Sequence, residues 1–315
     1  MNSSPKAAFK AVDDNRDLGF GSVVAQKSRQ RLLNRDGSFN VVRSGLGFWS
    51  SLSLYHALLS TSWLKFFSVL TGSYLALNAI FATAYFLCGP ETLNGGGTEL
   101  GVLRNFFFSI QTFATIGYGH ISPVGLMANV IVTLESVIGL LWLALATGLV
   151  FARFSRPTAK ITFSDRAVIA PYQGMTAFEF RIANERKNQI IELEAKVLFS
   201  HFIEEEGKRT RRFDLLALER SKVSFFPLNW TVVHPIDETS PLYRKNAADL
   251  RATEAEFLIL LTGIDETFSQ TVHARSSYRW DELVWNARFA SIYNQPIHNG
   301  KLTVDMRRLH VIEKL

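Results

Sequence analysis

The sequence has little cysteine, no apolar leader and, through its middle third, very little charge. Cys88 is the only cysteine among 315 residues, so the sequence excludes an intrachain disulfide and a CxxC metal site. Residues Met1–Lys10 lack the apolar run of a secretory signal peptide, so we expect targeting by internal segments. Charged residues are sparse between Leu46 and Val150 and dense on both sides, and this division predicts membrane-spanning segments.

Several signatures of other protein classes are also missing. The sequence has no basic stripe with interleaved aromatic residues, no complete glycine-rich dinucleotide loop, and no Ser-His-Asp set or carboxylate pair at a catalytic spacing. The net charge of +6 therefore does not indicate nucleic acid, because a protein with much of its mass in the cytoplasm is expected to be basic. We expect no nucleic-acid partner, no organic cofactor and no enzymatic activity.

Two apolar segments are long enough to cross a membrane. The first runs from Trp63 to about Cys88, and its uncharged stretch of about 22 residues would span about 33 Å as a helix. The second, Leu126–Ala152, contains Glu135 as its single charge. The intervening run Leu103–Phe113 predicts a helix about 16 Å long, which is too short to cross a bilayer and must re-enter on the same side.

The segment before the first span has apolar residues at helical spacing. Residues Phe48–Leu59 form either an interfacial helix anchored by Trp49 and Tyr55 or an ordinary helix on a soluble core. Eight basic residues precede Leu46, whereas the loop Gly89–Arg104 has one. The positive-inside rule therefore places both termini in the cytoplasm and the re-entrant loop outside the cell. We expect a multi-pass protein of the cell's inner membrane.

The chain changes character from Thr158 onward, where short segments, of which Ala177–Ile182 alternates strictly, predict strands. The expected strands are Ala177–Ile182, Glu192–Phe199, Phe257–Thr262 and Ser269–Ser276, with turn signals between them that include Gly263, and the expected helix is Ala247–Glu254. This pattern is typical of a β-sandwich of about 150 residues. The predicted divisions are 1–45, a mostly irregular cytoplasmic segment; 46–62, an interfacial helix; 63–157, the spans and re-entrant loop; and 158–315, the sandwich.

The motif Thr115-Ile116-Gly117-Tyr118-Gly119 lies between the two spans. Non-helical backbone at membrane depth is tolerated only where protein buries it or where it lines a watery cavity. An extended Thr-x-Gly-Tyr-Gly segment is typical of a potassium selectivity filter, in which backbone carbonyls replace the water around the ion. The carbonyls of Thr115, Ile116, Gly117 and Tyr118 and the Thr115 hydroxyl would bind K⁺. One chain supplies one wall, so this site requires a homotetramer.

The order of these features resembles that of the inward-rectifier potassium channels, most closely the bacterial KirBac-type branch. The residues that carry the resemblance are Gly148–Pro157, His234–Leu242, Leu261–Gly263 and Gln270–Arg275, in addition to Thr115–Gly119. The resemblance implies a membrane α-helical two-span pore domain with a re-entrant pore helix. It further implies a cytoplasmic all-β immunoglobulin-like sandwich and a tetramer.

Single residues in the spans have alternative interpretations. Glu135 either braces the filter from behind through hydrogen bonds or faces the pore, because an intramembrane acid is costly without partners or water. Gly139 is either a gating hinge or a site of close helix packing. Phe151 is either a hydrophobic gate that closes by dewetting or a lipid-facing side chain.

The resemblance implies further roles outside the filter. Gln111 stands where many members have a filter-supporting glutamate, so no salt bridge is expected there. Residues Gly263–Phe268 match a cytoplasmic constriction called the G-loop. Leu143 stands where animal members have a pore acid that binds polyamines or Mg²⁺, so block by these cations and rectification are expected to be weak.

Basic residues lie at the cytoplasmic ends of both spans, after the second span and at the start of the first. Arg153, Arg156 and Lys160, joined by Lys65, either bind anionic or phosphoinositide headgroups or only set the topology. The resemblance implies regulation by such lipids. Two other functional classes remain open from the sequence: a membrane-anchored sensing module with a vestigial pore, and a channel with a nucleotide-binding Rossmann domain. The strand-rich C-terminal half argues against the Rossmann domain.

Overall fold

The computed structural model describes residues 31–40, 54–96, 101–155, 159–186, 188–205, 207–226, 228–298 and 301–315. The chain forms two compact units. We call Ser44–Arg156 the membrane unit and Met1–Arg43 together with Pro157–Leu315 the β unit. Residues 31–40 therefore belong to the same unit as the C-terminal half of the chain, although the sequence predicted only an irregular segment there.

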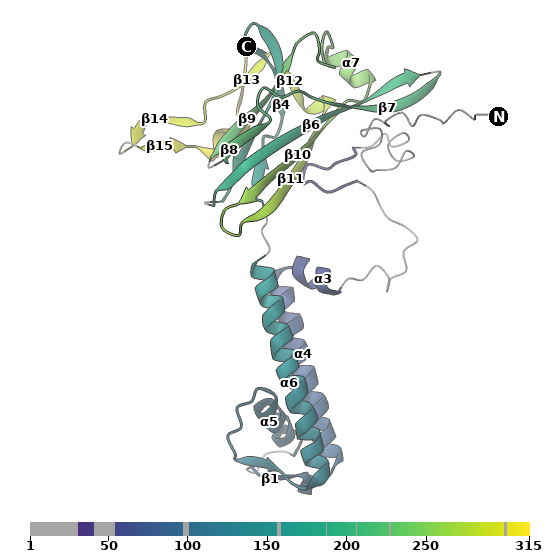
Figure 1. Ribbon diagram of the computed structural model, residues 1–315, viewed down its shortest axis with the longest axis vertical. Helices are drawn as coiled ribbons and strands as arrows, with labels where there is room; N and C mark the ends of the chain where they lie inside the picture. Colours follow the sequence, from purple (N-terminus) through teal and green to yellow (C-terminus); the bar gives the residue numbers. More distant parts are fainter. Residues whose placement is uncertain are drawn as a thin grey trace, which may run out of the picture. The chain divides into compact units, whose positions relative to one another are not determined.

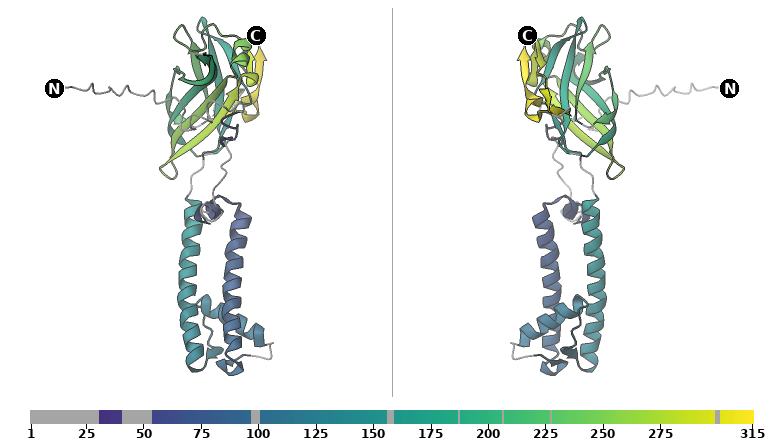
Figure 2. Two further views of the ribbon diagram at one scale, coloured as in Figure 1. Left: turned by 90° about the vertical axis from the view of Figure 1, so that its right-hand side faces the viewer. Right: turned by 90° about the vertical axis from the view of Figure 1, so that its left-hand side faces the viewer.

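The described elements of the membrane unit are α3 (Leu54–Ser60), α4 (Trp63–Leu87), η1 (Pro90–Thr92), β1 (Leu93–Gly95), α5 (Gly101–Phe113), β2 (Ile121–Pro123) and α6 (Gly125–Phe154). Figures 1 and 2 show α4 and α6 running alongside each other, with the short α5 against them near β1. Helices α4 and α6 are long and apolar enough to cross a membrane. The predicted two-span arrangement with a short intervening helix is confirmed.

The local sequence explains where these helices begin and end. The Ser62 hydroxyl accepts a hydrogen bond from the Lys65 amide and caps the N-terminus of α4. Helix α5 ends at Phe113, immediately before the glycine-containing motif, and α6 begins after the Ser122-Pro123 break. Of the predicted interfacial helix Phe48–Leu59, residues 48–53 lie outside the described residues, and the remainder falls within α3.

The β unit contains two five-stranded sheets among its described residues. One sheet has the order β11-β10-β6-β7, with β8 paired to β6, and the other has the order β12-β4-β5-β3, with β9 paired to β5. The strands of the first sheet are β6 (Ile190–Glu205), β7 (Lys208–Leu215), β8 (Lys222–Phe226), β10 (Glu256–Asp265) and β11 (Gln270–Arg279). Those of the second are β3 (Ile161–Phe163), β4 (Ala167–Tyr172), β5 (Met175–Asn184), β9 (Asn229–Ile236) and β12 (Leu283–Trp285). The remaining elements are α7 (Ala247–Ala252), η2 (Trp280–Glu282), β13 (Ala287–Phe289), β14 (Tyr293–His298), β15 (Lys301–Val304), η3 (Met306–His310) and β16 (Ile312–Lys314).

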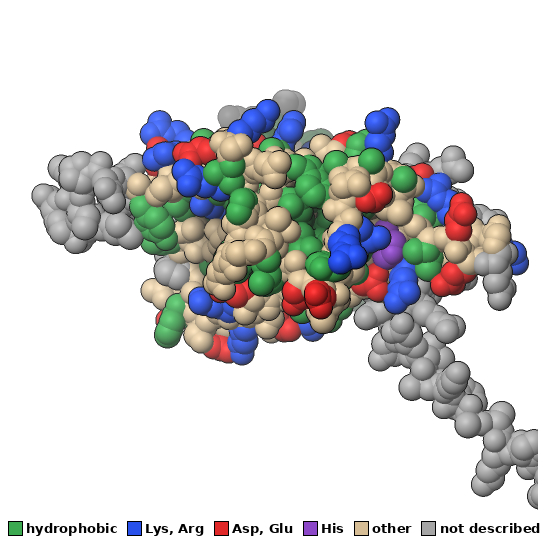
Figure 3. Space-filling model, turned by 90° about the horizontal axis from the view of Figure 1, so that it is seen from above, with side chains coloured by type: hydrophobic (Ala, Val, Ile, Leu, Met, Phe, Trp, Pro, Cys, Tyr) green, Lys and Arg blue, Asp and Glu red, His purple; other side chains and the backbone are tan. Residues whose placement is uncertain are grey.

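Aromatic residues that alternate along the strands join the two sheets. Phe178 of β5 stacks on Phe257 of β10 with ring centroids 4.3 Å apart, and Phe199 of β6 lies 5.2 Å from the same Phe257 ring. All three side chains are buried in one hydrophobic core. The two sheets therefore form a sandwich, as the sequence predicted. On the surface of the β unit that Figure 3 shows, basic and acidic side chains are intermixed.

His234 connects β9 to the turn that follows it. Its Nδ1 lies 2.6 Å from the Ala217 carbonyl oxygen and its Nε2 lies 2.7 Å from the Ser240 hydroxyl. Burial lowers the pKa of His234, which favours a neutral ring that donates to the carbonyl and accepts from the hydroxyl. This part of the His234–Leu242 match is thus structural.

One predicted turn is wrong. We expected Gly263 to mark a turn, but it lies inside β10, paired with Val272 and next to an irregularity in the pairing of β10 with β6. A Cβ atom at Gly263 would lie 2.7 Å from Ile190 Cγ2, so the glycine permits close approach of β6. The turn itself occupies residues 266–269 and includes Phe268.

Candidate functional site

The segment after α5 has a backbone that alternates in handedness. Thr115, Gly117 and Gly119 have φ angles of 56°, 56° and 77°, whereas Ile116 and Tyr118 are outside the left-handed region. Such alternation turns successive carbonyl groups toward the same side, which a regular strand does not do. No heavy atom lies within 4 Å of a Cβ placed on Gly117 or Gly119, so conformation and not space requires these glycines.

Helix α5 holds this segment by its last turn. The amides of Ile116 and Gly117 both donate to the Gln111 carbonyl oxygen, at 2.8 and 3.3 Å, and the Thr115 amide donates to Thr112. Gln111 thus supports the segment through its backbone. The negative end of the α5 dipole lies directly beside the segment, where it favours a cation.

Four polar side chains are buried together behind α5. Asn78 and Tyr85 of α4, Ser109 of α5 and Glu135 of α6 each have no solvent-exposed surface. The Tyr85 hydroxyl donates to Glu135 Oε2, and Ser109 Oγ hydrogen-bonds both Glu135 Oε1 and, at 3.0 Å, Asn78 Oδ1. The alternative in which Glu135 faces the pore is wrong, because its carboxyl group joins the three helices. The sequence identified Glu135 by its isolated charge but gave no signal for Tyr85, Asn78 and Ser109.

Gly139 lies where α6 passes the end of α5. A Cβ atom at Gly139 would lie 2.6 Å from the Phe113 carbonyl oxygen and 3.2 Å from Phe113 Cα. Helix α6 runs without interruption from Gly125 to Phe154. The structure therefore gives Gly139 the close-packing role.

Gly139→Ala is expected to weaken this contact, since the added methyl group meets backbone that cannot rotate away. We expect a loss of about 1–3 kcal/mol, typical of overpacking, seen as a lower thermal unfolding midpoint of the full chain in detergent. Gly148→Ala is the matched control, because a Cβ at Gly148 meets no atom within 4 Å. Equal midpoints for the two variants, with only the open fraction altered in Gly139→Ala, would favour the hinge instead.

The predicted gate and lipid residues of the membrane unit differ in environment. Phe151 is 71% exposed on α6. The Arg153 guanidinium donates to the carbonyls of Leu58 and Thr61 and lies 4.4 Å from the Trp63 ring. Arg153 thus ties the end of α6 to the connection between α3 and α4. Lys65 is exposed, and Arg156 lies outside the described residues.

In the β unit, Lys160 is exposed, and Phe268 lies 41% exposed in the turn between β10 and β11. Gly263 lies within β10, so it shares a hairpin with Phe268 but is not part of the turn. The structure therefore does not place Gly263 and Phe268 in one loop.

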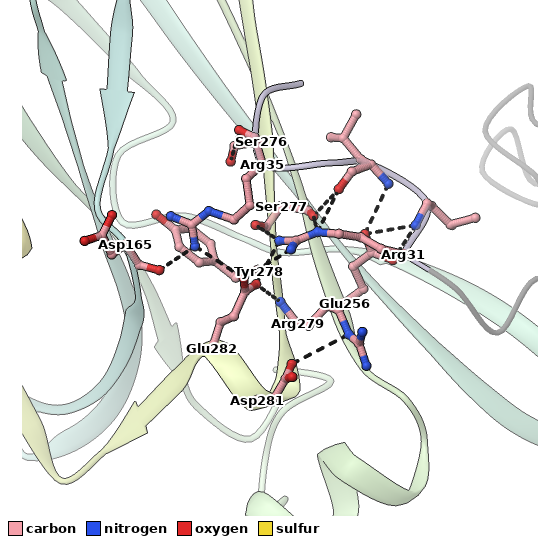
Figure 4. Close-up of polar contacts among 12 residues, drawn as sticks. Arg31, Arg35, Asp165, Glu256, Ser276, Ser277, Tyr278, Arg279, Asp281 and Glu282 are labelled. Atoms are coloured by element: carbon pink, nitrogen blue, oxygen red, sulfur yellow. Dashed lines mark hydrogen bonds and ion pairs between the residues drawn. The ribbon is translucent and has the colours of Figure 1, made fainter. Parts of the chain in front are cut away.

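Residues 31–40 attach to the C-terminal part of the β unit through contacts that the sequence did not reveal (Figure 4). Arg31 donates to both carboxylate oxygens of Glu282, at 3.1 and 2.8 Å, and to Ser277 Oγ at 2.8 Å. Arg35 Nη2 donates to the Ser164 carbonyl, and its guanidinium lies 4.9 Å from the Tyr278 ring. The only available signal was an apolar pair, Leu32–Leu33, flanked by arginines in a polar segment.

Two family models match the chain in the same order as its two units. The model described as "Inward rectifier potassium channel C-terminal domain" matches residues 161–315, and the model described as "Ion channel" matches residues 73–156. The chain is 43% identical to inward rectifier potassium channel Kirbac3.1 of Paramagnetospirillum magnetotacticum, over 93% of this chain and 99% of that protein. The chain belongs to the inward-rectifier potassium channel family.

More distant inward rectifiers match over most of the chain as well. Inward rectifier potassium channel irk-1 of Caenorhabditis elegans is 27% identical over 96% of this chain and 60% of that protein. Inward rectifier potassium channel 4 of Homo sapiens is 25% identical over 93% of this chain and 74% of that protein. The protein is therefore a membrane-embedded potassium channel and not an enzyme, and the β-rich C-terminal domain rules out the Rossmann alternative.

Proposed function

We propose that Thr115–Gly119 is the selectivity filter through which a homotetramer of this chain conducts K⁺. The observation that carries the proposal is the alternating backbone of this segment, left-handed at Thr115, Gly117 and Gly119, directly after the C-terminus of α5. Carbonyl oxygens turned to one side can replace the hydration shell of an ion once four chains surround it. Both termini lie in the cytoplasm, as the positive-inside rule predicts.

The proposal is tested with purified protein in liposomes. We expect uptake of Rb⁺ or Tl⁺ that exceeds Na⁺ uptake and is blocked by Ba²⁺. Equal uptake of Rb⁺ and Na⁺, or uptake that Ba²⁺ leaves unchanged, would contradict it. Cross-linking in the same membranes, with four chains as the expected limit, tests the tetramer separately.

The gates belong to the same proposal. An exposed Phe151 near the cytoplasmic end of α6 can meet its three counterparts on the axis and close the pore by dewetting. The β10–β11 hairpin that contains Gly263 and Phe268 forms the second constriction. Leu143, an exposed apolar residue on α6, replaces the pore acid that would hold polyamines or Mg²⁺, so rectification is weak.

Anionic lipid, including phosphoinositide, modulates the channel through Lys65, Arg156 and Lys160, and less through Arg153, whose guanidinium already binds two carbonyls. Lys65→Gln is expected to raise the mole fraction of anionic lipid needed for a half-maximal change in flux by about fivefold, from about 1 kcal/mol per basic residue. Flux is measured in liposomes of graded anionic-lipid content. Arg153→Gln is the comparison, with a lowered unfolding midpoint and a smaller change in lipid response. A larger lipid effect from Arg153→Gln would overturn this division of roles.

A further inference from the structure

The buried polar cluster behind α5 has a hydrogen-bond pattern that fixes where its protons lie. Asn78 Nδ2 donates to the Tyr74 carbonyl oxygen at 2.8 Å, which orients the amide so that Oδ1 faces Ser109 Oγ at 3.0 Å. An amide oxygen only accepts. Ser109 has a single hydroxyl proton, and for both its contact with Asn78 and its contact with Glu135 to be hydrogen bonds, it must donate that proton to Asn78.

Ser109 Oγ also contacts Glu135 Oε1 at hydrogen-bond distance. Its own proton is already used toward Asn78, so this second contact needs a proton on the carboxyl group. The other carboxyl oxygen, Oε2, accepts from the Tyr85 hydroxyl. A protonated carboxyl group has one donor and keeps its capacity to accept, which is the combination that these partners require.

The charges around the cluster agree with a neutral carboxyl group. In the described parts of the membrane unit, residues 54–96 and 101–155, no lysine or arginine side chain is within ion-pair distance of Glu135. Arg104 donates to the Leu93 carbonyl and Arg153 to the carbonyls of Leu58 and Thr61, whereas Lys65 is exposed. A fully buried carboxylate without a cation beside it would be destabilising, so the protonated form has the lower free energy.

We propose that Glu135 holds a proton in the folded channel and that Tyr85 and Asn78 act through it and Ser109 as positioning residues for the filter. The bonds then run in one direction, from Tyr85 to Glu135, to Ser109 and to Asn78. They attach α5 to α4 directly at Asn78 and attach both helices to α6 at Glu135. Ser109 lies on the helix whose last turn holds Thr115–Gly119. The inference rests on the proposed filter function, because its effect is read out in ion selectivity.

The test compares four variants of the full chain in liposomes by the ratio of Rb⁺ to Na⁺ uptake. Glu135→Gln is expected to keep the wild-type ratio, because its amide can donate to Ser109 and accept from Tyr85. Tyr85→Phe and Asn78→Leu are expected to lower the ratio at least about fivefold, since each leaves a buried polar group without its partner. Thr83→Val is the control: it removes an exposed hydroxyl from the same helix, and the ratio is expected to stay unchanged.

Infrared spectroscopy of the purified channel at neutral pH reports the protonation of Glu135 directly, and a role of Glu135 in packing alone would not change this signal. We expect a carbonyl band of a protonated carboxylic acid that Glu135→Gln removes. If the band is absent, or if Glu135→Gln lowers selectivity as much as Tyr85→Phe, Glu135 is ionised and the inference is wrong. Ratios for both Tyr85→Phe and Asn78→Leu that match Thr83→Val would overturn the positioning role. Equal Rb⁺ and Na⁺ uptake by the unsubstituted protein would instead contradict the filter proposal.

Discussion

Gly117→Ala is expected to abolish potassium selectivity while the membrane unit stays folded. The φ angle of Gly117 is 56°, and a side chain in this region costs about 1–2 kcal/mol per residue. Since four chains would line one pore, the penalty falls on the ion site four times. We expect the ratio of Rb⁺ to Na⁺ uptake to fall by at least about tenfold, the effect of about 1.4 kcal/mol.

The matched control for this substitution is Gly72→Ala. Gly72 lies within α4, and a Cβ there meets no atom within 4 Å, so the same added methyl group should be tolerated. The open space around Gly117 makes the comparison sharp, because a steric effect on the folded chain is absent at both positions. A Gly117→Ala channel with wild-type selectivity would show that ions pass elsewhere.

Glu256→Ala is expected to unfold the β unit at a lower temperature and to release residues 31–40. The Glu256 carboxylate accepts hydrogen bonds from the amides of Leu32 and Leu33 and lies 3.8 Å from Arg211 Nη1. Both charged side chains are almost completely buried, and burial lowers the pKa of Arg211 against the attraction of the acid. Removing one member of such a pair costs about 3–5 kcal/mol.

For a unit of this size that loss corresponds to a fall of about 6–20 °C in the unfolding midpoint. The midpoint is measured by calorimetry or intrinsic fluorescence on the full chain in detergent, and release of the segment by faster proteolysis within residues 31–40. Glu238→Ala provides the control, because Glu238 is exposed. A midpoint within 2 °C of the control's, about the effect of 0.5 kcal/mol, would show that Glu256 does not anchor the segment.

The sequence was sufficient to predict a helix or a strand where one local pattern dominates. The uncharged run Phe66–Leu87 predicted α4, because hydrocarbon leaves an apolar chain of that length no alternative to a helix. Alternation predicted the part of β5 that carries Phe178, since a strand places every second residue on one face, and short strand-like runs bounded by turn signals predicted the parts of β6 and β10 that carry Phe199 and Phe257. Element ends were less predictable: α7 ends two residues before the predicted Glu254.

Prediction failed where a residue's role depends on a distant part of the chain. Gly263 was interpreted as a turn residue from its local sequence. Its role is to allow the close approach of Ile190, which lies more than 70 positions away in the sequence. The sequence left Arg153 either as a headgroup ligand or as a topology signal, and neither alternative included the contacts of its guanidinium with Leu58, Thr61 and Trp63. In each case the partner is fixed by packing and carries no signal in the local pattern.

The motif Thr115–Gly119 shows both contributions in one segment. The sequence by itself determined its composition, its place between two spans and the need for residues that accept left-handed backbone, because these follow from local stereochemistry and hydrophobicity. Only the tertiary structure decided what stands behind it. The contact of Gly139 with Phe113 and the link from Tyr85 through Glu135 and Ser109 to Asn78 join α4, α5 and α6, and such contacts exist only once the three helices pack.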